Sequence, residues 1–221
     1  MDQEFWFPVQ LSLWVSSVTA VIVLITGIMA GRLFAKREFK GKIIWETIFI
    51  LPLVLPPSVI GFFLILLFGT NSTVGRGIET LIGSSVMFTP LAAVLAATVV
   101  AFPLMFQSAK AGFSSIDADI EGAAKIDGAN EGSLLFYISI PLAGRALVTG
   151  GILSFTRALG EFGATLMFAG NIPGKTQTIP TAIYVAIESG DMTLAYTYVL
   201  ISVAAAFILL SVTNSFARKI N

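Results

Sequence analysis

Long apolar runs separated by short polar connections make up nearly all of this chain. A helix rises about 1.5 Å per residue, so about 20 apolar residues are needed to cross a bilayer core of about 30 Å. Five segments reach that length, which predicts five full transmembrane helices. The five run from Val9 to Gly31, from Ile43 to Phe68, from Val86 to Gln107, from Leu142 to Phe168 and from Leu194 to Phe216.

Composition points to the same class of protein. Hydrophobic residues make up 56% of the 221 residues and charged residues only 12%, whereas about a quarter of a typical soluble domain is charged. We therefore expect an all-α integral membrane protein, with residues 1–221 forming a single transmembrane domain. Cysteine and histidine are both absent, which excludes disulfides, Cys/His metal sites and histidine bases. No metal site is expected.

One apolar segment is too short to cross the bilayer. Thr176 to Ser189 is moderately apolar, and we expect it to form a short helix on the outer surface or half-buried there. If it crossed fully, the chain would have six spans, and Arg218 and Lys219 would lie on the side that carries few basic residues. Five spans are therefore expected.

The second predicted span is irregular. Pro52, Pro56 and Pro57 lack the backbone donors that a helix needs, and lipid tolerates such a break only where protein or water satisfies the freed carbonyls. We expect the broken region to face the protein interior. A packing kink with no role in transport is an open alternative.

The placement of basic residues predicts the orientation, since cytoplasmic loops accumulate lysine and arginine. Ten of the thirteen lie on one side of the five predicted spans, which places the N-terminus outside and the C-terminus inside a cell membrane. These ten are Arg32, Lys36, Arg37, Lys40, Lys42, Lys110, Lys125, Arg145, Arg218 and Lys219.

A polar island, Lys110 to Arg145, interrupts the apolar pattern on the predicted cytoplasmic side. Acidic residues between Asp117 and Glu121 favour a helix start, because the helix dipole attracts negative charge there. Ala123 to Ile126 continue the helix, and Gly128 and Gly132 end or bend it. Such a helix can dock closely into a groove on a soluble partner. A connector lying on the membrane surface is the alternative, although such helices are usually basic.

The order of residues in this island resembles the signature loop of ABC importer permeases. Two alanines precede Gly128, and after nine intervening residues Ile138, Ile140 and Pro141 follow. The resemblance implies a type I ABC importer permease fold, in which a cytoplasmic coupling helix within residues 111–141 inserts into the ATPase subunit. Gly122 stands where the family has a glutamate, and Glu121 lies one place earlier. The implied coupling residues are Asp119, Glu121, Gly122, Ala123, Ala124, Asp127, Gly128 and Ala129.

Two further stretches are similar to permeases of the molybdate type, with sulfate permeases as near relatives. They are LPLVLPPSVIGF (Leu51 to Phe62) and SFTRALGEFGATLMFAGNIPGKTQTIPTAIY (Ser154 to Tyr184). The resemblance implies an importer of a tetrahedral oxyanion, molybdate or tungstate, with sulfate or thiosulfate as the alternative. It also implies three protein partners: a cytoplasmic ABC ATPase dimer, an extracytoplasmic oxyanion-binding protein and a second permease copy. No nucleic acid partner is expected.

The segment AGNIPGKT, Ala169 to Thr176, matches a loose form of the phosphate-binding loop. It follows a predicted transmembrane helix, contains Pro173 and lies on the predicted outer side, so we do not expect it to bind nucleotide. The chain should bind no cofactor and should not itself be an enzyme. ATP-Mg would be used by the partner ATPase.

Arg157 and Glu161 are the only ion-pair candidates deep in a predicted span. Four residues apart, they would share one helix face, and a charge at the bilayer centre costs at least about 2.5 kcal/mol. These two residues would either line the translocation path near a gate or fix the packing of the span or the subunit interface. Gly150, Ser154 and Ala158 form a stripe of small residues that suits a dimer contact or a thin-walled path. Candidate path or packing residues are Pro56, Pro57, Ser58, Ser154, Arg157 and Glu161.

A doubly charged oxyanion cannot enter hydrocarbon, where burial of an isolated ion costs roughly tens of kcal/mol. Since the spans offer only Arg157 as a positive partner, a wet, weakly binding passage between two permease copies is expected. Two other classes stay open. A secondary transporter would use Glu161 as a proton or sodium site and would usually show repeated halves, and a membrane anchor or assembly factor would have no passage.

Overall fold

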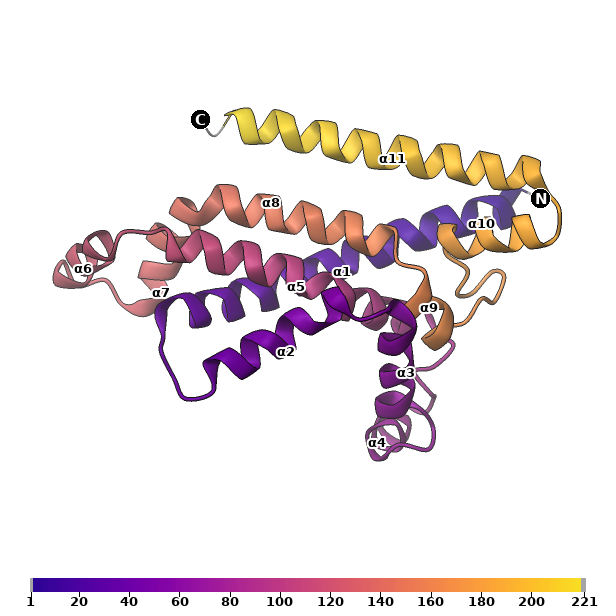
Figure 1. Cartoon of the computed structure of the whole chain (residues 1–221), viewed down its shortest axis with the longest axis horizontal. Helices are drawn as coiled ribbons and strands as arrows, with labels where there is room; N and C mark the ends of the chain where they lie inside the picture. The colour runs from indigo at the N-terminus through magenta and orange to yellow at the C-terminus, as the bar shows by residue number, and fades with distance from the viewer. Residues whose placement is uncertain (1, 220–221) are drawn as a thin grey trace.

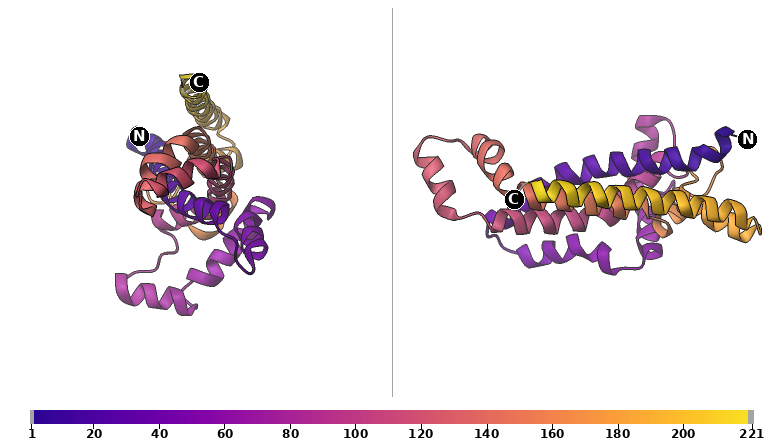
Figure 2. Two further views of the ribbon diagram at one scale, coloured as in Figure 1. Left: turned by 90° about the vertical axis from the view of Figure 1, so that its left-hand side faces the viewer. Right: turned by 90° about the horizontal axis from the view of Figure 1, so that it is seen from above.

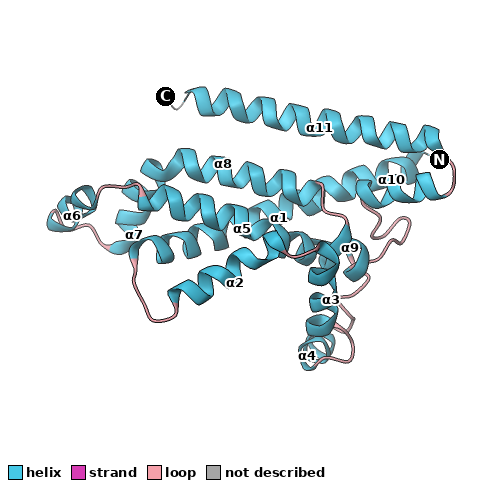
Figure 3. Cartoon of the chain, in the orientation of Figure 1, coloured by secondary structure: helices cyan, strands magenta, loops and turns pink. Residues whose placement is uncertain are grey.

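The structure, a computed structural model, describes residues 2–219, with side chains described for residues 4–81 and 83–211. The side chains of the basic tail residues Arg218 and Lys219 lie outside that range. The regular elements of the described chain are helices (Figure 3). They are α1 (Asp2–Lys36), α2 (Lys42–Val54), α3 (Pro57–Phe68), α4 (Thr73–Ile82), α5 (Pro90–Ser114), α6 (Ala118–Ile126), α7 (Glu131–Leu134), the π-helix η1 (Leu135–Ser139), α8 (Ile140–Leu159), α9 (Gly163–Phe168), α10 (Ile179–Glu188) and α11 (Met192–Lys219).

Three long helices, α1, α5 and α8, pack side by side at the centre of the molecule (Figures 1 and 2). Glycine makes their close approach possible. A Cβ added at Gly31 of α1 would lie 2.5 Å from Cβ of Ala109 in α5, and one added at Gly150 of α8 would lie 2.5 Å from Cβ of Ser108. Small residues at helix contacts are the usual device for close packing in membranes.

The second predicted span is broken, as its prolines predicted, and forms two helices. Helix α2 packs against α5, and Phe49 of α2 lies 5.2 to 5.4 Å, between ring centroids, from Phe34, Phe102 and Phe106. The chain then bends by 117° between α2 and α3. Pro57 is the first residue of α3, where the fixed φ of proline suits a helix start, and Pro56 precedes it in a non-helical conformation.

Within the described residues of this single chain the break is not covered by other helices, so its predicted place facing the protein interior stays a prediction. Pro56 and Pro57 are exposed, Pro52 is half-buried, and α2 has no buried residue. The physical reason is that α1, α5 and α8 already fill the centre, so the bent pair lies on its flank. Helix α3 packs instead against α9, where a Cβ added at Gly163 would lie 2.8 Å from Cβ of Pro57.

The fourth predicted span is shorter at its C-terminal end than expected. Helix α8 ends at Leu159, and Gly163–Phe168 forms the separate helix α9. The predicted short segment at 176–189 is the ten-residue helix α10, which packs against α11. Helix α11 runs along α8 and is mostly exposed (Figure 1).

Within the described residues, four helices are long and apolar enough to cross a membrane, and the bent α2–α3 pair raises the number to as many as five. The chain is therefore a multi-pass membrane protein. The described N-terminal end of α1 and the C-terminal end of α11 lie toward opposite ends of the molecule, and α6 projects beyond the bundle at the end toward which α11 runs (Figure 1).

Candidate functional site

The polar loop, residues 111–141, carries a short helix with well-formed ends. Asp117 caps α6, since its Oδ1 accepts a hydrogen bond of 3.0 Å from the backbone N of Asp119. Acidic residues in the first turn and Lys125 in the last suit the helix dipole. Gly128, with φ of 91°, follows α6, and the backbone N of Ala129 donates to the carbonyl of Ala124 at 2.9 Å. The helix start and stop predicted from the sequence are both confirmed.

No residue of α6 is buried. Its outer surface combines carboxylates with two apolar side chains that the sequence reasoning missed, Ile120 at 47% exposure and Ile126 at 88%. The signal that could have found them is a large apolar side chain in a short segment that otherwise consists of charged residues, alanine and glycine. A side chain at Gly122 would also meet open space, because no atom lies within 4 Å of an added Cβ there.

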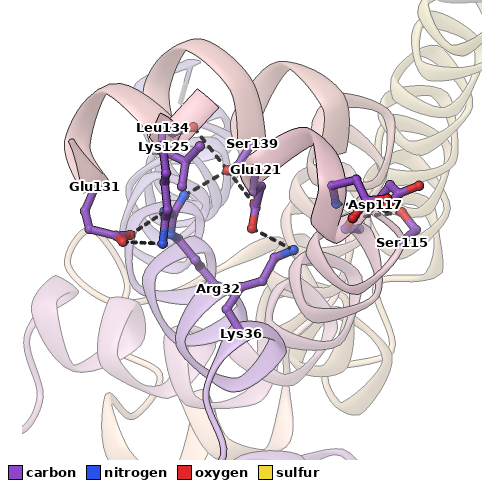
Figure 4. Close-up of polar contacts among 11 residues, drawn as sticks. Arg32, Lys36, Ser115, Asp117, Glu121, Lys125, Glu131, Leu134 and Ser139 are labelled. Atoms are coloured by element: carbon purple, nitrogen blue, oxygen red, sulfur yellow. Dashed lines mark hydrogen bonds and ion pairs between the residues drawn. The ribbon is translucent and has the colours of Figure 1, made fainter. Parts of the chain in front are cut away.

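Glu121 points inward, toward the bundle (Figure 4). Its side chain is only 13% exposed, and its Oε2 lies 3.0 Å from Nζ of Lys36, near the end of α1. Its Oε1 accepts a hydrogen bond of 3.0 Å from the hydroxyl of Ser139. The sequence placed Glu121 correctly at the start of a helix but did not show that this helix turns the carboxylate toward α1.

A second set of polar contacts extends this cluster (Figure 4). Arg32 donates from Nη1 to the hydroxyl of Ser139 at 3.0 Å, and its Nη2 lies 3.2 Å from Oε2 of Glu131. The other oxygen of Glu131 lies 2.8 Å from Nζ of Lys125. Ser139 is fully buried at the centre of these contacts. Arg32, Lys36, Glu131 and Ser139 were not predicted as site residues, because no local sequence pattern links the basic residues of α1 to the residues around α6.

Ser139 reaches this position through an irregular turn. Pro141 has no N–H with which to continue the α-helical hydrogen bonds, and the five residues before α8 form a π-helix, η1. The backbone N of Ile140 accordingly bonds to the carbonyl of Leu135, five residues earlier. Single π-turns inside α-helices are frequent at functional sites.

The small-residue stripe of α8 packs inside the chain rather than on a free surface. Ser154 is fully buried and donates to the carbonyl of Ala101 in α5 at 3.2 Å. Gly150 lies against Ser108, which is also in α5. Both residues therefore hold α8 to α5, and the predicted dimer contact or thin-walled path at this stripe is wrong for Gly150 and Ser154.

Arg157 and Glu161 form the predicted ion pair, with 2.7 Å between Nη1 and Oε2. The prediction that they share one helix face is wrong, because α8 ends at Leu159 and Glu161 lies in the break before α9. The second carboxylate oxygen of Glu161 accepts a hydrogen bond of 2.9 Å from the backbone N of Ala164, in the first turn of α9. The ion pair, together with this hydrogen bond, joins the end of α8 to the start of α9 across the non-helical residues between them.

The remaining path candidates lie close to this break. Pro57 packs against Gly163, two residues after Glu161, while Pro56 and Ser58 are exposed. The structure thus brings Pro57 near Glu161 and places Ser154 separately, on the face of α8 that packs against α5. The coupling candidates and the path candidates lie toward opposite ends of α8.

Comparison with known proteins assigns the fold and the family. The family of binding-protein-dependent transport system inner membrane components matches residues 15–221. The chain belongs to this family. The protein YvgM of Bacillus subtilis, whose name assigns it to a molybdenum transport system as permease, is 56% identical over 94% of this chain and 91% of its own length. The molybdenum transport system permease ModB of Escherichia coli K12 is 38% identical over 96% of this chain and 93% of its own.

Solved structures share the architecture. A bacterial ABC transporter that imports alginate matches 100% of this chain and 81% of its own chain, with a TM-score of 0.78 and 14% identity. The methionine ABC transporter MetNI in an inward-facing form matches 100% and 99%, with a TM-score of 0.70 and 15% identity. The predicted fold of a type I ABC importer permease is confirmed.

Proposed function

We propose that this chain is the permease subunit of an ATP-driven molybdate importer, with tungstate as a closely related cargo. The observation that carries this proposal is the 56% identity to a molybdenum transport permease over 94% of the chain. The N-terminus would lie outside the cytoplasm and the polar loop inside. ATP and Mg²⁺ would be bound by a separate ABC ATPase dimer.

The geometry of α6 supports a role in coupling. It is an exposed, capped helix that projects from one end of the membrane bundle (Figure 1), so a soluble protein can reach it without entering the bilayer. Its surface offers Ile126 among charged neighbours, a mixture of apolar and polar contacts that suits a protein groove. ATPase closure on nucleotide would move α6, and with it the bundle, between two states.

The packed centre of the bundle supports a passage between two copies. Met105 and Phe106 of α5 are fully buried between neighbouring helices, so the middle of one chain is filled by side chains rather than water. An oxyanion cannot cross such a core at a tolerable free energy. A second permease copy would supply the opposite wall, and an extracytoplasmic binding protein would select the anion.

The secondary-transporter alternative is disfavoured by the surroundings of Glu161. One of its oxygens pairs with Arg157 and the other accepts from the backbone of Ala164. A carboxylate held in this way is suited to fixing the α8–α9 break and is poorly suited to releasing and rebinding a proton or sodium ion in each cycle.

Reconstitution with its partners tests the proposal. The chain, a molybdate-type ABC ATPase and the binding protein of the same organism would be assembled in liposomes with ATP inside. We expect molybdate uptake that stops without ATP and that tungstate competes for. Sulfate uptake of equal efficiency would favour the sulfate alternative, and uptake driven by an ion gradient without ATP would overturn the proposal.

A further inference from the structure

Glu121 and Gly122 are neighbours on α6, but side chains at these two positions point in different directions. An added Cβ at Gly122 meets open space, so a side chain there would point toward a docked partner. One residue earlier, a side chain points about 100° away around the helix. That turn directs Glu121 inward, where Lys36 and Ser139 hold its two oxygens at 3.0 Å each.

We propose that Glu121 is a positioning residue that ties α6 to α1, so that the two helices move as one body during the transport cycle. This inference rests on the proposed function and deepens it. We call the contacts the α1 tie: Lys36 with Glu121, Ser139 with Glu121, Arg32 with Ser139, and Arg32 with Glu131. Glu121 thus acts inside the permease and not as a contact to the ATPase.

The α1 tie supplies a connection that the backbone does not. Helix α6 is joined along the chain to α5 through Ser115–Asp117 and toward α8 through α7 and η1. Its link to α1 crosses 85 residues of sequence and consists of polar side chains. A movement of α6 without the tie would pass into α5 through the turn at Ser115–Asp117 and toward α8 through α7 and η1. With it, the same movement also reaches α1, which packs along both of those helices.

The burial of the α1 tie fits a mechanical role better than that of an ordinary surface pair. Exposed ion pairs contribute little because water and salt screen them. Here the side chains of Glu121, Arg32 and Lys36 are 13%, 16% and 26% exposed, and Ser139 is fully buried. Glu131 is 68% exposed, so its contact with Arg32 is screened and contributes less than the other three. The single hydroxyl proton of Ser139 is shared between Glu121 and the carbonyl of Leu134, which lie 3.0 and 3.1 Å away. Charge-assisted contacts in such surroundings hold their geometry.

The test compares Glu121→Gln with Glu38→Gln in the reconstituted importer. Glu38 is a matched control, since it is a glutamate of the loop between α1 and α2, 88% exposed, and is paired with Lys42 at 2.6 Å. We expect Glu121→Gln to retain the ATPase on an affinity column but to lower molybdate moved per ATP by about fivefold or more, the size of a typical coupling between sites. Exchanging the charges, Lys36→Glu with Glu121→Lys, should restore most of the loss.

Three results would separate the possibilities. If Glu121→Gln transports per ATP as well as Glu38→Gln, the α1 tie does not transmit movement. If it loses ATPase retention and transport in proportion, Glu121 is an ATPase contact and the inference is overturned. If the wild-type assembly itself shows no ATP-dependent molybdate uptake, it is the proposed function that fails.

A covalent tie provides a second test that does not depend on the stability of Glu121→Gln. The chain has no cysteine, so Lys36→Cys with Glu121→Cys can be bridged selectively by a short bis-methanethiosulfonate linker, which forms a reducible disulfide with each thiol and releases methanesulfinate. We expect bridging to raise molybdate moved per ATP in this double variant, because it replaces the lost contacts. Uptake that stops on bridging and returns on reduction would show that α6 must separate from α1, and would overturn the inference.

Discussion

At the scale of single residues, the polar loop depends on backbone conformation as much as on side-chain chemistry. Gly128 adopts a φ of 91°, in the left-handed region, and lets the backbone of Ala129 return to the carbonyl of Ala124. No atom lies within 4 Å of an added Cβ at this position. A substitution there therefore tests the conformation of the loop and not a crowded contact.

We predict that Gly128→Val weakens ATPase docking and that Gly128→Asn does so much less. A β-branched residue in the left-handed region costs about 1–2 kcal/mol, whereas asparagine visits this region readily. If the strain misplaces α6 when it docks, retention of the ATPase should fall by about tenfold for valine, since about 1.4 kcal/mol corresponds to that factor. Membrane insertion should be unchanged. Equal retention by the two variants would show that the left-handed turn does not position α6.

At the scale of elements, the sequence predicted the helices better than their breaks. Apolar length placed α1, α5 and α11 correctly, because a long apolar run in lipid has no alternative but to form a helix. It missed the break after Leu159, since glycines such as Gly160 and Gly163 are common within membrane helices. The sequence predicted the break at the prolines of the second span but not the bend of 117° between α2 and α3. The inward turn of Glu121 was also beyond reach, because its partner Lys36 lies 85 residues away and no local pattern links the two.

The packing of α5 against α8 makes a prediction with its control on the same helix. Gly150→Ala would bring a methyl group to 2.5 Å from Cβ of Ser108, whereas Gly144→Ala meets no atom within 4 Å. We expect the first to destabilise the protein by about 1–3 kcal/mol through overpacking. The second should be neutral or stabilising by up to about 1 kcal/mol, because alanine is the better helix former. Thermal unfolding of the purified variants in detergent measures both. Equal melting temperatures for the two variants would show that Gly150 and Ser108 are not in close contact.

At the scale of the whole molecule, two ends with different chemistry are separated by the length of the bundle. One end carries α6 and the α1 tie, and the other carries the N-terminal end of α1, α10 and the break between α8 and α9 (Figure 1). This polarity matches the proposed direction of transport, in which the ATPase acts at one end and the anion arrives at the other. The proposed coupling therefore depends on which end of the molecule faces the cytoplasm.

Cysteine labelling can determine that orientation directly, since the wild-type chain has no cysteine and gives no background. Ile126 in α6 and Lys175 in the loop before α10 are both exposed, at 88% for Ile126. In intact cells, a membrane-impermeant maleimide should label Lys175→Cys and leave Ile126→Cys unlabelled until the membrane is permeabilised. Co-expression of the ATPase should then protect Ile126→Cys, because a docked groove covers the outer face of α6, while Lys175→Cys stays reactive. If Ile126→Cys is labelled in intact cells, no cytoplasmic ATPase can reach α6, and both the proposed coupling and the role of the α1 tie in it are wrong.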